Sequence, residues 1–183
     1  AVPKRVGIVV LNTGENSVDC GVIDAANGYA YFGTYTSPGI IVKVALGAGD
    51  APPTRVGATK LLVGENLLYS AAVIDTVNGY AYFGTLTSPV IIVKVALGAG
   101  SAPPARIDAV TLSAGENNIY NSVIDTTNGY LYFGTYTSPG IIVKVALGTG
   151  PAAPTRVGAV TLNAGENSIG SAVIDVAAGY AYF

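Results

Sequence analysis

The stretch that decides the fold reads Gly28-Tyr-Ala-Tyr-Phe-Gly-Thr-Tyr-Thr-Ser-Pro-Gly39, and the chain contains it repeatedly. It returns as GYAYFGTLTSPV at residues 79–90 and as GYLYFGTYTSPG at residues 129–140, and GYAYF stands once more at residues 179–183. Successive copies begin 51, 50 and 50 residues apart. A fixed period of this length is typical of repeat architectures. The chain of 183 residues is therefore expected to form a single repeat domain.

Each repeat predicts four short strands and no helix. In the second repeat the strands are expected at residues 55–62, 70–75, 80–85 and 91–97, which are rich in β-branched and aromatic side chains. Asn78-Gly79 predicts a type I′ hairpin turn, in which both central residues have positive φ. The Thr-Ser-Pro-Gly sequences predict the following turn, with proline fixing its own φ and glycine supplying a permissive position.

Four antiparallel strands in each repeat of about 50 residues predict an all-β fold, a β-propeller built from four-stranded blades. A parallel β-helix or a leucine-rich solenoid would have a shorter period. The chain would hold three complete blades and an incomplete fourth. The expected boundaries are 1–15 for the outermost strand of a split blade (a strand over residues 4–11), 16–65, 66–116 and 117–166 for the complete blades, and 167–183 for the inner strands of the incomplete blade.

The run Asn-Gly-Tyr-Ala-Tyr-Phe-Gly-Thr, with Val-Ile-Asp before it and Ile-Ile-Val-Lys-Val after it, resembles the bacterial YVTN-type and NHL-like propeller repeats. The resemblance covers essentially the whole chain. It implies that the strand ending in Val-Ile-Asp is innermost and that Arg-Val-Gly-Ala-Val-Thr-Leu is outermost. It also implies that the residues just before each innermost strand lie at one end of the central channel, where propellers commonly bind ligands. It implies little about activity, because propellers host many functions.

The composition excludes several classes of protein. Only 11% of the residues are charged and the net charge is −2, a balance that favours association between molecules. The nine Lys and Arg residues are spread along the chain, so no nucleic-acid partner is predicted. No apolar run is long enough for a membrane span. Cys20 is the one cysteine and histidine is absent, so neither a disulfide, a metal site nor a cofactor is predicted.

Charged residues that recur once per repeat are expected to have structural roles. The aspartates are expected to cap the Asn-Gly turns rather than form a ring that binds cations. The arginines are expected to form one surface ion pair per repeat between blades, with either the glutamates or the aspartates, each worth about 0–1 kcal/mol. The lysines are expected to face solvent and to discourage edge pairing. These residues are Asp24, Asp75, Asp125 and Asp175; Arg5, Arg55, Arg106 and Arg156; Glu15, Glu65, Glu116 and Glu166; and Lys43, Lys94 and Lys144.

Positions at which the repeats differ are better candidates for binding. The loops leading into the innermost strands read Asp19-Cys20, Tyr69-Ser70, Tyr120-Asn121 and Gly170-Ser171. Tyrosine with serine or asparagine suits stacking and hydrogen bonding to a sugar or a peptide, although neutral variation of surface loops explains the same pattern. The candidate ligand-binding residues are Asp19, Tyr69, Ser70, Tyr120, Asn121 and Ser171. Cys20 has no histidine to activate it and is expected to be incidental.

The sequence favours a non-enzymatic structural or interaction protein that associates with other copies of itself, secreted or at the cell surface. An enzyme is not expected, because histidine is absent and the acidic residues recur symmetrically. The expected assembly edge comprises Tyr180, Tyr182, Phe183, Arg5 and Val6. Three explanations of the incomplete blade stay open: an excerpt of a longer propeller, completion by a neighbouring copy in an oligomer or filament, and a frayed four-bladed domain. The alternative function is a lectin-like module that binds a glycan or peptide at the channel mouth.

Overall fold

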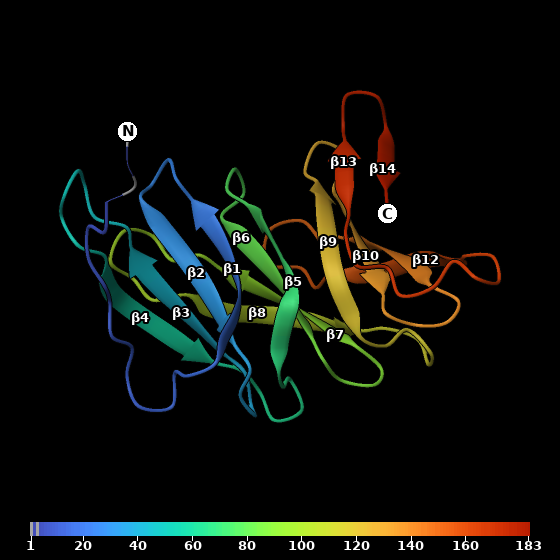
Figure 1. Cartoon of the computed structure of the whole chain (residues 1–183), viewed down its shortest axis with the longest axis horizontal. Coiled ribbons are helices and arrows are strands. Elements are labelled where there is room, and N and C mark those ends of the chain that lie inside the picture. Colours follow the sequence, from blue (N-terminus) through green and yellow to red (C-terminus); the bar gives the residue numbers. More distant parts are fainter. Residues whose placement is uncertain (1, 3) are drawn as a thin grey trace.

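The computed structural model describes residues 2 and 4–183 and consists of antiparallel sheets placed side by side (Figure 1). Each of three sheets has four strands, which we call blades 1 to 3, and a two-stranded hairpin follows. Neighbours in each sheet are consecutive in the chain. The strands are β1 (Val18–Asp24), β2 (Tyr29–Thr34), β3 (Ile40–Ala45) and β4 (Thr54–Lys60) in blade 1; β5 (Leu68–Asp75), β6 (Tyr80–Thr85), β7 (Ile91–Ala96) and β8 (Ala105–Thr111) in blade 2; β9 (Ile119–Asp125), β10 (Tyr130–Thr135), β11 (Ile141–Ala146) and β12 (Thr155–Thr161) in blade 3; and β13 (Val173–Asp175) and β14 (Tyr180–Tyr182) in the hairpin.

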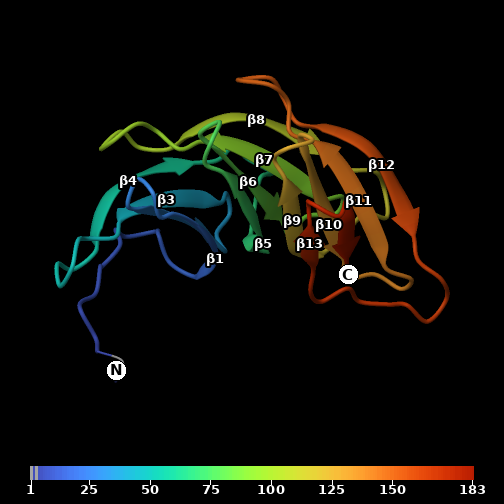
Figure 2. The same ribbon diagram turned by 90° about the horizontal axis from the view of Figure 1, so that it is seen from above.

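The blades stand one after another in an arc (Figure 2). The first strands of the sheets, β1, β5, β9 and β13, lie on the concave side, and the fourth strands, β4, β8 and β12, lie on the convex side. The expected all-β fold with repeated four-stranded, propeller-like blades is confirmed at this level. Within residues 2 and 4–183, no helix has the length and apolarity needed to cross a membrane.

The hydrophobic core is divided into two clusters, one at each interface between complete blades. Phe83 on β6 packs with Tyr31 and Ile41 between blades 1 and 2, and Phe133 on β10 packs with Tyr82 and Ile92 between blades 2 and 3. Blade 2 therefore buries side chains on both faces, against blade 1 and against blade 3, as layered sheets do. In β7 of blade 2, the four consecutive residues 92–95 are accordingly buried, whereas a strand with one face in solvent would show an alternating pattern.

The predicted type I′ turn is wrong. Tyr80 pairs with Asp75, so the hairpin loop has four residues, 76–79, instead of two. The Gly79 amide donates to the Asp75 carbonyl oxygen at 2.9 Å. Gly79 alone in this loop has a positive φ, of 77°. The Asp75 side chain caps the turn and makes the longer loop favourable.

Glycine in the Thr-Ser-Pro-Gly turn serves packing, not a permissive φ. Gly39 lies outside the left-handed region. A Cβ atom placed on it would lie 2.9 Å from Cγ of Leu68. Leu68 belongs to the next blade and is fully buried. The peptide bond between Ser37 and Pro38 is cis. The absence of a side chain at Gly39 therefore lets blade 2 approach blade 1 closely.

The expected strand over residues 4–11 is absent, and this correction has a clear cause. The segment, which includes Arg5 and Val6, runs exposed beside blade 1 without strand pairing. A Cβ atom on Gly7 would lie 2.5 Å from Pro52 Cβ, as one on Gly57 of β4 would lie 2.9 Å from Pro103 Cβ. The segment thus takes the place of an outermost strand against the next blade. It is not a strand because no third strand of the same blade lies beside it to accept its hydrogen bonds.

The two parts of the expected assembly edge lie at opposite ends of the arc. The N-terminal segment with Arg5 and Val6 lies against blade 1, whereas the β13–β14 hairpin lies beside β9 of blade 3 (Figures 1 and 2). Tyr180 and Tyr182 on β14 are 62% and 59% exposed, and Phe183 follows the strand. The two parts therefore do not meet within one chain.

Candidate functional site

The repeated lysines do not face solvent as predicted. Lys43 and Lys94 have no exposed surface at all. The Lys43 ammonium donates to the carbonyl oxygens of Leu97 at 3.1 Å, Gly98 at 2.7 Å, Gly100 at 2.8 Å and Ala102 at 3.2 Å, all on the loop after β7 of the next blade. Lys94 makes the same four bonds, at 2.7–3.0 Å, to the loop after β11.

We call this set of four hydrogen bonds the lysine joint. It forms because the loop after β7 turns its carbonyl groups toward the lysine ammonium. Gly98 and Gly100 have φ of 70° and 50°, a backbone conformation that places several carbonyl oxygens on one side of the loop. The Tyr29 ring centroid lies 4.1 Å from the Lys43 ammonium on the opposite side. Burial lowers the pKa of Lys43, and the Asp24 carboxylate opposes that shift. The lysine thus satisfies carbonyl groups that burial would otherwise leave unpaired.

The arginines pair with glutamate, one of the two acidic partners that the sequence left open, but the pairs lie within single blades instead of between blades and are more buried than expected. Arg55 pairs with Glu15, Arg106 with Glu65 and Arg156 with Glu116, so each pair joins the outer strand of a blade to the loop that enters that blade. The glutamate side chains are only 5–7% exposed. The hydrogen bond from Arg55 lowers the pKa of Glu15, against the effect of burial. Planar two-point contact of this kind favours arginine over lysine.

These pairs predict that the protein loses stability in acid. Burial raises the pKa of Glu116, but the Arg156 and backbone hydrogen bonds outweigh it, so the pKa in the folded state lies below the ordinary value of 4.5. The stabilisation is therefore present above about pH 4.5 and is lost as the pH falls through the folded-state pKa. We expect Glu116→Gln to lower the free energy of unfolding by about 1–3 kcal/mol at neutral pH and to reduce its acid dependence. Urea denaturation between about pH 3 and 7 measures both effects.

Glu166→Gln is the matched control, because this glutamate is exposed and pairs with no arginine in the described residues. If the free energy of unfolding of the Glu116→Gln variant falls in acid as steeply as that of the parent protein, the role given to the Arg156–Glu116 pair is contradicted.

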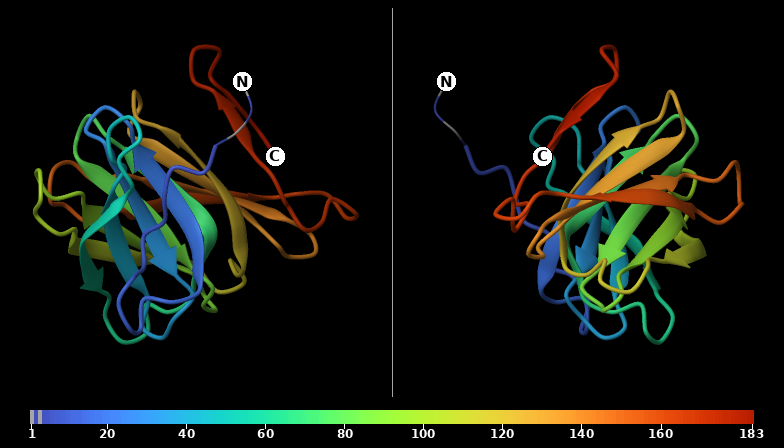
Figure 3. Two further views of the ribbon diagram at one scale, coloured as in Figure 1. Left: turned by 60° about the vertical axis from the view of Figure 1, so that its left-hand side comes forward. Right: turned by 90° about the vertical axis from the view of Figure 1, so that its right-hand side faces the viewer.

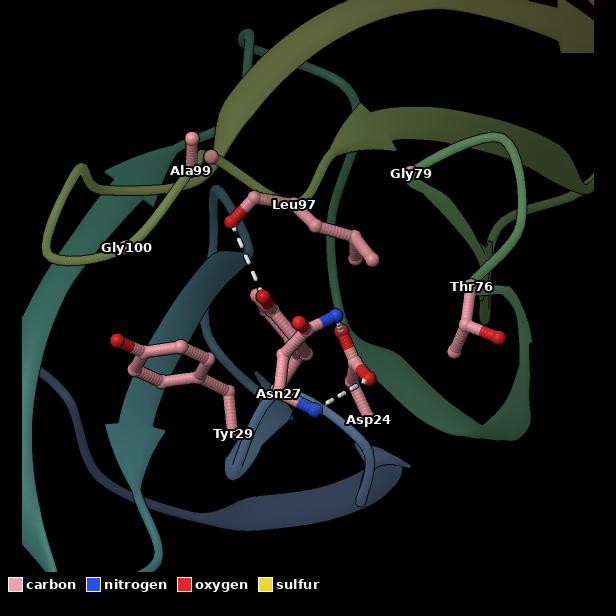
Figure 4. Close-up of a pocket in the computed structure, with 10 residues that line it drawn as sticks. Asp24, Asn27, Tyr29, Thr76, Gly79, Leu97, Ala99 and Gly100 are labelled. Carbon is pink, nitrogen blue, oxygen red and sulfur yellow. Dashed lines mark hydrogen bonds between the residues drawn. The ribbon is translucent and has the colours of Figure 1, made fainter.

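The repeated aspartates cap turns, as predicted. Asp24 accepts hydrogen bonds from the backbone amide of Asn27 at 3.2 Å and from its side-chain amide at 2.8 Å (Figure 4). Asp75 with Asn78 and Asp125 with Asn128 repeat this arrangement. Residues 2 and 4–183 contain no group of three potential ligands that could hold a metal ion.

A cavity of about 510 Å³ lies between blades 1 and 2, lined by Asp24, Asn27, Tyr29 and the loop over residues 97–100 (Figure 4). The Tyr31 hydroxyl donates to the Leu97 carbonyl oxygen at its wall, at 3.1 Å. Corresponding residues form a cavity of about 480 Å³ between blades 2 and 3. A third cavity, of about 330 Å³, lies between blade 3 and the hairpin and is lined by Asp125, Lys144 and Tyr180, without a corresponding loop. The loop that accepts the lysine hydrogen bonds lines the first two cavities, so these two accompany the contact between complete blades.

The opposite end of the blades carries a different feature, a row of four tyrosines drawn from three blades. Tyr35 lies 5.9 Å from Tyr69, Tyr69 lies 5.1 Å from Tyr120, and Tyr120 lies 4.6 Å from Tyr136, measured between ring centroids. The first two contacts are edge-to-face, with interplanar angles of 68° and 75°. Tyr35 and Tyr136 are 38% and 49% exposed. We call this surface the tyrosine row.

The row brings together two of the candidates taken from sequence, Tyr69 and Tyr120. They lie within β5 and β9, not in the preceding loops as expected. Sequence comparison of the repeats missed Tyr35 and Tyr136, which follow β2 and β10. The signal was present, because the corresponding residue of blade 2 is Leu86, so this position also differs between repeats.

The other candidate residues have different surroundings. Asp19 and Ser171 are exposed. The Ser70 hydroxyl donates to the Tyr120 carbonyl oxygen at 2.7 Å and so links β5 to β9. Asn121 is buried, and its amide donates to the Ile169 carbonyl oxygen at 2.7 Å, so it is not available at the surface as expected. Cys20 is also buried, and burial raises the pKa of its thiol to about 12, which leaves it unreactive.

Comparison with known proteins gives likenesses to solved structures. No protein-family model matches the chain, and no curated protein matches it. A crystal structure from Bacteroides uniformis, provisionally named 6-phosphogluconolactonase, is similar over 78% of this chain, with a TM-score of 0.44 and 9% sequence identity. The chain spans 56% of the length of that protein.

The expectation that the chain is not an enzyme is corrected by this comparison. A protein with a similar arrangement of strands carries the name of an enzyme, so the exclusion of enzymes made from sequence is withdrawn. The absence of histidine and the symmetric recurrence of the acidic residues are features of composition alone, and they do not exclude catalysis because one fold can carry many functions. At this level of similarity the likeness assigns no reaction to the present chain.

Proposed function

We propose that the chain is part of a ligand-binding β-propeller of the YVTN or NHL-like kind, and that the tyrosine row binds neutral sugar rings. The observation that carries the proposal is the row itself, in which residues from three separate blades form one continuous aromatic surface. The four rings come together only when the blades are packed side by side. The row is not part of the hydrophobic core, because its outer two rings remain partly exposed.

The chemistry of the row favours a sugar. A tyrosine ring offers a flat apolar face to the C–H groups of a sugar, and its hydroxyl offers a hydrogen bond to the sugar's own hydroxyl groups. Because tyrosine has few rotatable bonds, ordering it on binding costs little conformational entropy. Asp19 takes the repeat position of Tyr69 and Tyr120 in blade 1, and it is the one charged residue at that position. A neutral ligand therefore fits better than an anionic one.

A glycan array probed with the 183-residue protein tests the proposal. Tyr69→Ala and Tyr120→Ala are each expected to weaken binding of a recognised glycan about tenfold or more, since a lost aromatic contact and hydrogen bond are worth about 1–2 kcal/mol. Tyr180→Ala is the matched control, because Tyr180 is an exposed tyrosine outside the row. Urea denaturation of each variant separates loss of binding from loss of folding.

A protein that binds no glycan, or a Tyr120→Ala variant that binds as the parent does, would contradict the proposal. Binding of peptides in place of glycans would assign the row to a different class of ligand and would also overturn it.

Self-association, the other function expected from sequence, stays a prediction. The N-terminal segment and the hairpin lie at opposite ends of the arc, and a second copy of the chain would bring these two parts together, which supports the prediction (Figure 1). We expect a native particle at least twice the mass of the 18.4 kDa chain, measured by light scattering on a size-exclusion column. A particle with the mass of one chain would contradict it.

A further inference from the structure

The third lysine of the repeat lacks the joint that the first two make. Lys144 stands on β11 as Lys43 stands on β3, and its ammonium lies 3.7 Å from the Tyr130 ring centroid, close to the 4.1 Å seen for Lys43 and Tyr29. Lys43 and Lys94 each bond to four carbonyl oxygens, but Lys144 bonds to none among residues 2 and 4–183. A partly buried ammonium group thus keeps its aromatic neighbour without its acceptors.

Two further contacts are missing at the same place. A Cβ atom on Gly57 of β4 would lie 2.9 Å from Pro103 Cβ, whereas one on Gly158 of β12 would meet no atom within 4 Å. The β6 strand pairs with β7 on one edge, whereas the corresponding edge of β14 is unpaired (Figure 3). Tyr182 is consequently 59% exposed, while Tyr82 at the same repeat position is 1% exposed.

One continuous segment makes all of these contacts at the interface between blades 1 and 2. Its β7 strand pairs with β6, its following loop gives the four carbonyl groups to Lys43, and Pro103 then packs on Gly57. The segment over residues 141–152 gives the same strand pairing and the same carbonyl groups at the next interface. A single segment of this type would therefore satisfy β14, Lys144 and Gly158 together.

We propose that the free edge of β14, Lys144 and Gly158 form one acceptor surface for a partner segment that carries the repeat's own third-strand sequence. The partner chemistry is specific: a strand of the type Ile-Ile-Val-Lys-Val-Ala-Leu, a Gly-x-Gly loop that turns its carbonyl oxygens toward Lys144, and a proline that covers Gly158. Strand addition supplies main-chain hydrogen bonds, and the lysine joint gives selectivity for the loop. This surface is distinct from the tyrosine row and does not depend on it.

A labelled peptide with the sequence of residues 86–104, which carries β7, the Gly-x-Gly loop and Pro103, tests the proposal when it is titrated into the 183-residue protein. We expect saturable binding, together with slower hydrogen exchange of the β14 amides. A peptide with the sequence of residues 86–97, which lacks the Gly-x-Gly loop and Pro103, is expected to bind at least tenfold more weakly. A scrambled peptide of the same composition controls for non-specific hydrophobic association.

Two protein variants locate the contact. Lys144→Met is expected to weaken binding of the long peptide at least tenfold and to leave binding of the short peptide unchanged. Lys60→Met, at an exposed lysine on β4, is expected to alter neither. Failure of the long peptide to bind, or equal binding to the Lys144→Met variant, would overturn the proposal. A self-associated particle that the peptide neither binds nor dissociates would overturn it as well.

Discussion

Replacing Lys94 with methionine is expected to lower the free energy of unfolding by about 3–5 kcal/mol, because Lys94 is fully buried and donates four hydrogen bonds to carbonyl oxygens. Methionine keeps the apolar stem and approximate volume of lysine but donates no hydrogen bond. The carbonyl oxygens of Leu147, Gly148, Gly150 and Ala152 would then lose the donor that they share. Denaturation in urea, followed by tyrosine fluorescence, measures the change.

The same substitution at Lys144 is the control that separates the joint from the lysine itself. Lys144 has the same local sequence and the same tyrosine neighbour, yet it makes no carbonyl bonds within the described residues. We expect Lys144→Met to change the free energy of unfolding by less than about 1 kcal/mol. Equal losses at the two positions would show that the carbonyl groups do not account for the role of Lys94.

Replacing Phe83 with alanine is expected to cost about 3–5 kcal/mol of stability, because it opens a cavity in the cluster between blades 1 and 2. Phe83 is fully buried and packs among side chains of both blades. The backbone of either blade cannot move to fill the cavity without disturbing the packing of the other side chains in this cluster. Thermal and urea unfolding measure the loss, and both should show a lower midpoint with little change in cooperativity.

Phe32→Ala is the matched control for this prediction. Phe32 and Phe83 occupy the same position in the identical sequence Tyr-Ala-Tyr-Phe-Gly-Thr, but Phe32 is only half-buried, because no complete blade covers its side of blade 1. We expect it to cost clearly less, about 1–2 kcal/mol. An equal or larger loss at Phe32 would contradict the view that the interface between blades is the main source of stability.

Much of the architecture follows from the sequence alone. The period predicts the repeated blades, and the β6 strand was expected at residues 80–85, where the structure has it. Local contacts were also predictable, since the caps of Asp75 on Asn78 join residues three apart and depend only on the neighbouring backbone. The type I′ turn was the exception, because that same aspartate side chain favours a longer loop than the Asn-Gly pair suggests.

What the tertiary structure alone decides is which neighbour each repeated residue receives. Lys43, Lys94 and Lys144 have the same local sequence, but the first two are buried in a carbonyl-lined joint and the third is not. A lysine in a strand predicts a side chain exposed to solvent. Its burial becomes favourable only when a second sheet packs on that face and a loop of that sheet offers oxygen acceptors to the ammonium group. The tyrosine row likewise joins residues from three repeats, up to 101 positions apart, between Tyr35 and Tyr136. Sequence determines the strands through local preferences, whereas burial and aromatic contact depend on which blades lie side by side.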